Sequence, residues 1–174
     1  MDRPEIKQNI AKVRQEELAK AANIIGYKRV HYLGYRDSGM PDTEANKNPD
    51  CFANAPLDEA VGRLVKIIRE EKPHVIVTYP DDQQGYQHPD HLKVFDISLP
   101  AWEAAGDPLK FPEFGDPWTP LKLYYTTWSR ARIEALHDMF IKLKIESPFN
   151  DAWFGRPSQD LSLIHISEPT RPAL

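Results

Sequence analysis

The residues most suited to chemistry are His88, Asp90 and His91, in the stretch Gly-Tyr-Gln-His-Pro-Asp-His at positions 85–91. Two imidazoles three residues apart share one face of a first helical turn, and a carboxylate between them can fix one ring's tautomer. This combination is typical of metal ligation and of acid–base catalysis. The same spacing also fits a solvated helix surface, or an N-cap followed by an incidental second histidine. Spacing alone leaves these alternatives open.

The elements around this motif place it where a strand ends and a helix begins. Residues 74–79 are a short β-branched run between Pro73 and Pro80, which predicts a buried strand. A polar, glycine-containing loop follows, and apolar residues at helical spacing then predict a helix to about Ala105. Binding and catalytic sites in α/β sheets usually lie at such junctions.

The rest of the chain alternates helices with strands. Apolar periodicity predicts helices over 4–25, 56–71 and 129–144, and strands over 29–35 and 121–127. The order indicates an α/β fold, a Rossmann-like, mainly parallel sheet with crossover helices. Because the chain starts on a helix, the sheet is expected to be missing its first strand.

Two polar positions outside the motif have competing interpretations. Arg14 and Glu17 stand three residues apart on the first predicted helix, which suits an exposed pair contributing a few tenths of a kcal/mol. Asp37 follows the 29–35 strand, so its carboxylate could face the same crevice as the histidine motif. It could equally organise its own loop through an Asx-turn with Gly39.

Composition excludes several classes of protein. The 174 residues favour one domain, and a net charge of −4 without a basic cluster argues against a nucleic-acid-binding scaffold. The single cysteine, Cys51, excludes an internal disulfide framework. No apolar run reaches transmembrane length, so a cytoplasmic protein without membrane partners is expected. Nothing in the composition indicates an oligomeric state.

Motifs spread over much of the chain resemble the LmbE/PIG-L family of zinc-dependent deacetylases. Their order and spacing across about residues 1–155 carry the resemblance. They are Arg14-Gln-Glu-Glu17, Leu33-Gly34-Tyr35-Arg36-Asp37-Ser38-Gly39, Asp50-Cys51-Phe52-Ala53, Pro73-His74-Val75 and the 85–91 motif, followed by Ala104-Ala105-Gly106-Asp107, Phe111-Pro112, Pro117-Trp118 and Lys122-Leu123-Tyr124-Tyr125.

The resemblance implies a role for each matching residue. His91 matches a zinc ligand, and His88 matches the catalytic histidine that stabilises the tetrahedral intermediate or protonates the leaving amine. Asp90 would orient His88, and Tyr86 matches a mobile tyrosine that polarises the scissile carbonyl. The substrate-binding residues implied for the sugar hydroxyls are Arg14 and Asp37.

One departure from the family pattern concerns the metal. The family opens with a strand and an Ala-His-Pro-Asp-Asp-Glu-type motif that supplies two more zinc ligands and a general base, and these 174 residues contain no such motif. Catalytic zinc sites normally use three side chains, so zinc should bind weakly or not at all. We therefore expect this chain alone to be no competent hydrolase. A metal-free sugar-binding module and an inert, aggregation-prone remnant are the other hypotheses.

The domain and substrate expectations complete the interpretation. Residues 1–160 are expected to form a partial deacetylase domain. Residues 161–174 resemble a translated sequencing adaptor and are expected to be a disordered tail without function. Within the family, the aromatic loop 106–118 favours cleavage of the cysteinyl amide in a mycothiol conjugate. Deacetylation of an N-acetylglucosaminyl inositol, at the same glucosamine nitrogen, is the alternative substrate.

Overall fold

A computed structural model describes residues 9–81, 87–126 and 130–149 of the chain. The chain divides into two compact units, Met1–Gly34 and Tyr35–Leu174. The expected tail, 161–174, lies outside the described residues.

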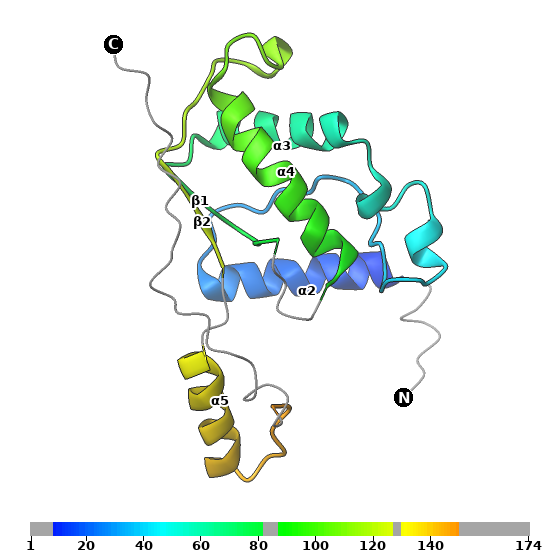
Figure 1. Ribbon diagram of the computed structural model, residues 1–174, viewed down its shortest axis with the longest axis vertical. Coiled ribbons are helices and arrows are strands. Elements are labelled where there is room, and N and C mark those ends of the chain that lie inside the picture. Colours follow the sequence, from blue (N-terminus) through cyan, green and yellow to red (C-terminus); the bar gives the residue numbers. More distant parts are fainter. Residues whose placement is uncertain (1–8, 82–86, 127–129, 150–174) are drawn as a thin grey trace. The chain divides into compact units, whose positions relative to one another are not determined.

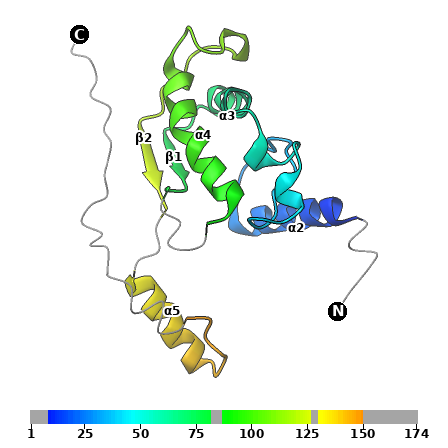
Figure 2. The ribbon, with the colours of Figure 1, turned by 45° about the vertical axis from the view of Figure 1, so that its right-hand side comes forward.

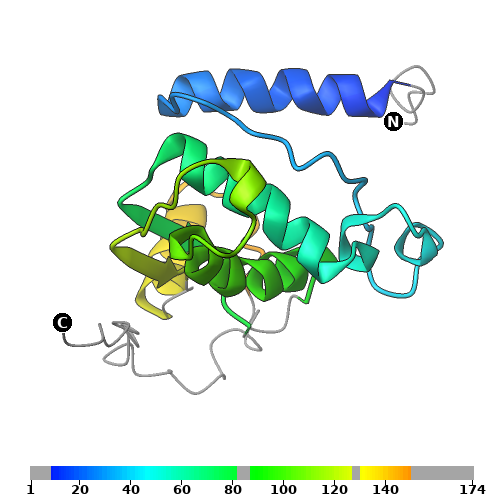
Figure 3. The ribbon, with the colours of Figure 1, turned by 90° about the horizontal axis from the view of Figure 1, so that it is seen from above.

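The first unit is built on the helix α2, Ile10–Ile25, seen in Figure 3 as one continuous rod. Gly26 ends it in the left-handed region, at φ 87°, and its N–H donates to Ala22 O. The helix therefore ends where the predicted range 4–25 ends, and glycine suits this position because it adopts positive φ without steric cost. The predicted first turn, 4–8, lies outside the described residues.

The predicted strand over 29–35 is wrong: these residues form no strand in the structure. Only the next residue, Arg36, makes an isolated parallel bridge, to Cys51. A strand exists only when a neighbour accepts its backbone bonds, and β propensity cannot supply that neighbour. Gly34, at φ 83°, also interrupts the extended conformation.

Among the described residues, the sheet of the second unit has two parallel strands, β1 (Val75–Thr78) and β2 (Lys122–Tyr125), drawn side by side in Figure 2. Their register pairs Val75 with Lys122 and Thr78 with Tyr125. The connection between them contains a long helix, as parallel pairing requires. The α/β fold with a parallel sheet and a crossover helix is confirmed.

Two helices pack on each other, α3 (Leu57–Glu71) and α4 (Pro89–Gly106), which cross in Figure 1, and α4 also contacts β1. The core lies between them, where the buried side chains include Ala60, Val65, Ile68, Ile97, Ala101 and Ala105. The hydroxyls of Thr78 and Ser98 bond at 2.6 Å and tie β1 to α4. Both helices match the predicted ranges, since their apolar stripes face the core.

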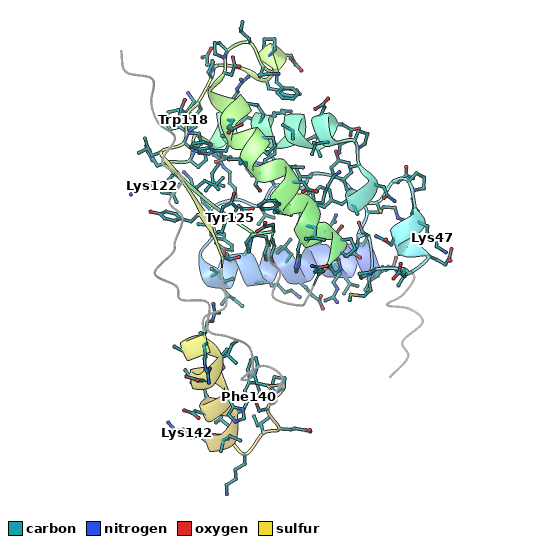
Figure 4. The ribbon with its side chains drawn as sticks, viewed as in Figure 1. Lys47, Trp118, Lys122, Tyr125, Phe140 and Lys142 are labelled. Carbon is teal, nitrogen blue, oxygen red and sulfur yellow. The ribbon has the colours of Figure 1, made fainter. Side chains whose placement is uncertain are left out.

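A buried arginine shapes the segment after α4. Arg69 of α3 is 3% exposed, and its guanidinium donates to six backbone carbonyls. The acceptors are Ala104, Ala105, Asp107, Lys110, Phe111 and Gly115, at 2.6–3.3 Å. The segment contains η3 (Pro112–Phe114) and leads to Trp118, whose Nε1 donates to Pro73 O at 2.8 Å. Figure 4 labels Trp118 at the approach to β2.

Two short 3-10 helices, η1 (Ala45–Lys47) and η2 (Phe52–Asn54), lie between Asp37 and α3. Tyr35 anchors the start of this region to α3: its ring stacks on Phe52 at 5.3 Å and its hydroxyl donates to Glu59 at 3.1 Å. The last described helix is α5, Arg130–Lys142, within the predicted range 129–144, whose first residue lies outside the described residues. Within the described ranges, no helix combines the length and apolarity needed to cross a bilayer.

Candidate active site

The start of α4 fixes His88. This residue is the N-cap of the helix, Pro89 occupies the first helical position, and the Asp90 N–H donates to His88 Nδ1 at 3.2 Å. Proline suits that position because its missing N–H would have no helical partner. Since Nδ1 accepts a hydrogen bond, a neutral His88 ring carries its proton on Nε2.

His91 lies one turn further along α4 and is held by stacking. Its ring stacks on Tyr79, with centroids 4.3 Å apart and an interplanar angle of 15°. The His88 and His91 rings are 5.2 Å apart, so they share a face as their spacing predicts. Partial burial, followed by the neighbouring His88, lowers the pKa of His91, and Asp90 opposes this shift. The neutral imidazole that metal ligation requires is therefore favoured.

Asp37, in the loop after residue 36, lies beside the histidine motif at the start of α4. Its Oδ1 accepts the Gly39 N–H at 2.8 Å, the Asx-turn that the sequence allows. Ligand atoms of Asp37, His88 and Asp90 also lie within 4.8 Å of one another. The two interpretations of Asp37 therefore coexist: it organises its loop, and it contributes a carboxylate to the motif.

The carboxylate of Asp90 is held mainly from outside the motif. Ser38 donates to it twice, from its backbone N to Oδ2 at 3.2 Å and from Oγ to Oδ1. Asp90 Oδ2 lies 4.0 Å from His88 Nδ1, beyond hydrogen-bond range. Asp90 thus contacts His88 through its backbone N–H, and Ser38 through its carboxylate.

The structure brings together three of the six residues singled out in the sequence, Asp37, His88 and Asp90, and places the His91 ring against His88. Tyr86 lies outside the described residues. Arg14 belongs to the first unit, on α2, where its side chain is 74% exposed and bonds Glu17 at 2.8 Å. That pair is the exposed ion pair expected from the spacing.

Sequence reasoning missed two neighbours of the site, Ser38 and Tyr79. Ser38 stood in a loop rich in turn-forming residues, so its hydroxyl carried no separate signal. Tyr79 was included in the predicted strand as an apolar residue. Its position directly after β1, at the end of the strand where sites gather, was the available clue.

The donor set fits a divalent metal ion by residue type. Imidazole nitrogens and carboxylate oxygens are the ligands of catalytic zinc, and the group Asp37, His88 and Asp90 offers one imidazole and two carboxylates. His91 adds a second imidazole beside them. The Asp90 oxygens and the Asp37 Oδ1 already accept hydrogen bonds. A metal ion bound to these oxygens would therefore compete with those hydrogen bonds for their lone pairs.

The fold and the site together define an α/β protein with titratable side chains gathered at the carboxyl end of a parallel strand, the usual place for catalysis in this architecture. Residues 1–102 match the family model described as PIG-L: GlcNAc-PI de-N-acetylase. The chain belongs to the PIG-L family.

Two relatives illustrate its place within the family. A mycothiol S-conjugate amidase of Streptomyces coelicolor is 41% identical over 159 residues, covering 88% of this chain and 53% of that protein. A 1D-myo-inositol 2-acetamido-2-deoxy-alpha-D-glucopyranoside deacetylase of Catenulispora acidiphila is 44% identical over 124 residues, covering 69% of this chain and 38% of its own length. The chain therefore spans about half, or less, of these relatives.

A solved structure supports the fold independently. The N,N'-diacetylchitobiose deacetylase from Pyrococcus horikoshii aligns with a TM-score of 0.55 over 86% of this chain and 55% of its own, at 20% sequence identity. Its likeness extends to the α/β architecture alone.

Proposed function

We propose that the chain is part of a metal-dependent hydrolase that cleaves the amide at a glucosamine nitrogen, with a mycothiol conjugate as the substrate. The observation that carries the proposal is the gathering of Asp37, His88 and Asp90, with His91 beside them, at the end of β1 in a PIG-L family chain. The amidase relative, aligned over 88% of this chain, supports the thiol-conjugate substrate.

The residues would divide the work by their geometry. His91 is proposed as the metal ligand, since burial favours its neutral form and Tyr79 holds its ring. A bound zinc ion would polarise the amide carbonyl and activate water. His88, with its proton on Nε2, is proposed as the donor to the carbonyl oxygen or to the departing amine.

The remaining roles concern the substrate. Asp37 is exposed and retains acceptor capacity beyond its Asx-turn, so it suits a hydrogen bond from a sugar hydroxyl. Arg14 is also proposed as a substrate-binding residue, and Tyr86 as the group that polarises the carbonyl. Asp90 is proposed to orient His88.

Deacetylation of an N-acetylglucosaminyl inositol is the second candidate function, favoured by the 44% identical deacetylase relative. Both reactions release an acyl group from a glucosamine nitrogen, so one site accommodates either. Parallel assays of the purified protein on a mycothiol conjugate and on the N-acetylglucosaminyl inositol decide between them.

We further propose that these 174 residues alone bind zinc weakly and do not turn over, because they contain one of the three zinc ligands that the family motifs supply. The test is the zinc content of the purified chain, together with hydrolysis of both substrates. Stoichiometric zinc with turnover would contradict this proposal. Sugar binding that persists in excess chelator would instead favour a metal-free binding module.

A version engineered to carry an added N-terminal strand with a His-Pro-Asp-Asp motif of the family type tests the catalytic proposal itself. The extended protein is expected to hydrolyse one of the two substrates and to lose activity on His88→Ala and on His91→Gln. A matched control is His137→Gln on α5, a histidine outside the site. An extended, folded and zinc-loaded protein that hydrolyses neither substrate would refute the proposed function.

A further inference from the structure

Ser38 has the environment of a residue built to hold one group in place. It is fully buried, at 0% exposure. Its backbone N and its Oγ each donate to one oxygen of the Asp90 carboxylate. The Ala53 N–H of η2 donates to the same Oγ at 2.8 Å. Because a hydroxyl has one proton, and a backbone donor already occupies an Oγ lone pair, that proton is directed to Asp90.

The bonds from Ser38 to Asp90 determine which group of Asp90 forms a hydrogen bond with Nδ1 of His88. The Asp90 carboxylate would be the stronger partner for a protonated Nδ1, since charged acceptors form stronger hydrogen bonds than neutral ones. It lies 4.0 Å away, bonded to Ser38. The Asp90 backbone N–H donates to Nδ1 instead, at 3.2 Å, so the proton of a neutral ring lies on Nε2.

We propose that Ser38 is a positioning residue for His88: by holding the Asp90 carboxylate, it keeps Nδ1 an acceptor and Nε2 a donor. The inference rests on the proposed function, in which His88 donates a hydrogen bond or a proton to the reacting amide. Without the hydroxyl, the carboxylate turns toward Nδ1 and stabilises the tautomer protonated there. His88 then presents a lone pair at Nε2 and loses its donor.

The test reads the His88 ring by NMR, independently of hydrolysis. The 15N-labelled chain is measured by long-range 1H–15N correlation at about pH 8, where an ordinary imidazole is neutral. A His88→Gln variant assigns the signals. The wild-type ring is expected to show the Nε2–H pattern, and Ser38→Ala to shift most of the population to the Nδ1–H pattern. Ser38→Thr, which retains a hydroxyl, is expected to keep the wild-type pattern.

Two variants separate positioning from a general loss of structure. Ser98 is another buried serine, 4% exposed, whose hydroxyl bonds Thr78, and it lies on α4 ten residues after His88. Ser98→Ala is expected to leave the His88 pattern unchanged. The double variant Ser38→Ala, Asp90→Ala removes the carboxylate that captures the proton, so the Nε2–H pattern returns. A disturbed helix start would not be repaired by a second truncation.

A folded Ser38→Ala protein with an unchanged His88 pattern would overturn the inference, and so would a pattern that the double variant fails to restore. Should Ser38→Ala not fold, Ser38→Cys gives the same readout, because a thiol is a much weaker donor of similar shape. Failure of the extended wild-type protein to hydrolyse either substrate, with the Nε2–H pattern intact, would refute the proposed function alone.

Discussion

Replacing Arg69 by methionine tests whether one buried guanidinium holds the aromatic segment after α4. The thiol-conjugate prediction rests on the aromatic loop 106–118, and this loop contains four of the six carbonyls that Arg69 contacts, those of Asp107, Lys110, Phe111 and Gly115. Methionine retains much of the buried stem and removes every donor. The substitution therefore isolates the hydrogen bonds from the packing.

The expected loss of stability follows from the number of bonds. A hydrogen bond within a protein contributes about 1 kcal/mol net, and more when one partner is charged. A guanidinium has five N–H protons, so the six contacts count as about five bonds and set an upper range of about 5–8 kcal/mol. Freed loop carbonyls regain water, and the methionine variant no longer bears the cost of burying a charged guanidinium, so a net loss of about 3–5 kcal/mol is expected. This is a large part of the 5–15 kcal/mol of a typical domain.

Urea unfolding followed by tryptophan fluorescence measures the effect, because Trp118 reports on the segment through its bond to Pro73. Arg69→Lys keeps the charge with fewer donors and should lie between the wild type and the methionine variant. The matched control is Arg63→Met, on the same helix but with a side chain 43% exposed, for which a loss below about 1 kcal/mol is expected. A loss for Arg69→Met no larger than that of the control would refute the reasoning.

Three further predictions concern the site and the sheet. Because the pKa of His91 is lowered by burial, the unfolded chain protonates first as the pH falls below about 6.5, so acidification destabilises the fold. The fall in urea midpoint between about pH 7 and pH 5 should be smaller in His91→Gln; an equal fall contradicts this. Tyr79→Phe should preserve the stack on His91 and the stability of the fold. Tyr79→Leu should lower the free energy of unfolding by about 0.5–1.5 kcal/mol more than the loss of buried area explains. The control is the loss measured for Tyr27→Leu in the first unit. Trp118→Phe should cost about 1 kcal/mol in thermal unfolding through the lost bond to Pro73 O, and no change would exclude that bond as a stabilising contact.

Local patterns in the sequence predicted the elements that depend on local physics. The helices α3 and α4 follow from apolar periodicity, and Gly26 ends α2 because its backbone adopts φ 87°. β1 follows from a short β-branched run between two prolines. The segment 29–35 has the same composition as a strand yet forms none, because pairing depends on a neighbour that composition does not specify.

Contacts between distant positions were the part that the sequence could not supply. Within the part of the chain that the structure describes, Arg69 donates to backbone carbonyls 35–46 residues away. Every residue has a backbone carbonyl, so no sequence motif can identify these acceptors. The grouping of Asp37 with His88 and Asp90 was reachable, because the family resemblance assigned all three to one site.

The Asp90 carboxylate shows how the two kinds of information combine. Chain proximity suggested that it orients His88, its neighbour two residues away. In the structure, Ser38, 52 residues away, donates to both carboxylate oxygens, while the backbone of Asp90 serves the imidazole. A helix N-cap requires an acceptor on the capping side chain, and His88 meets that need only with Nδ1 unprotonated. The cap and the Ser38 bonds therefore favour the same tautomer, and weakening either should weaken the donor that the proposed chemistry needs.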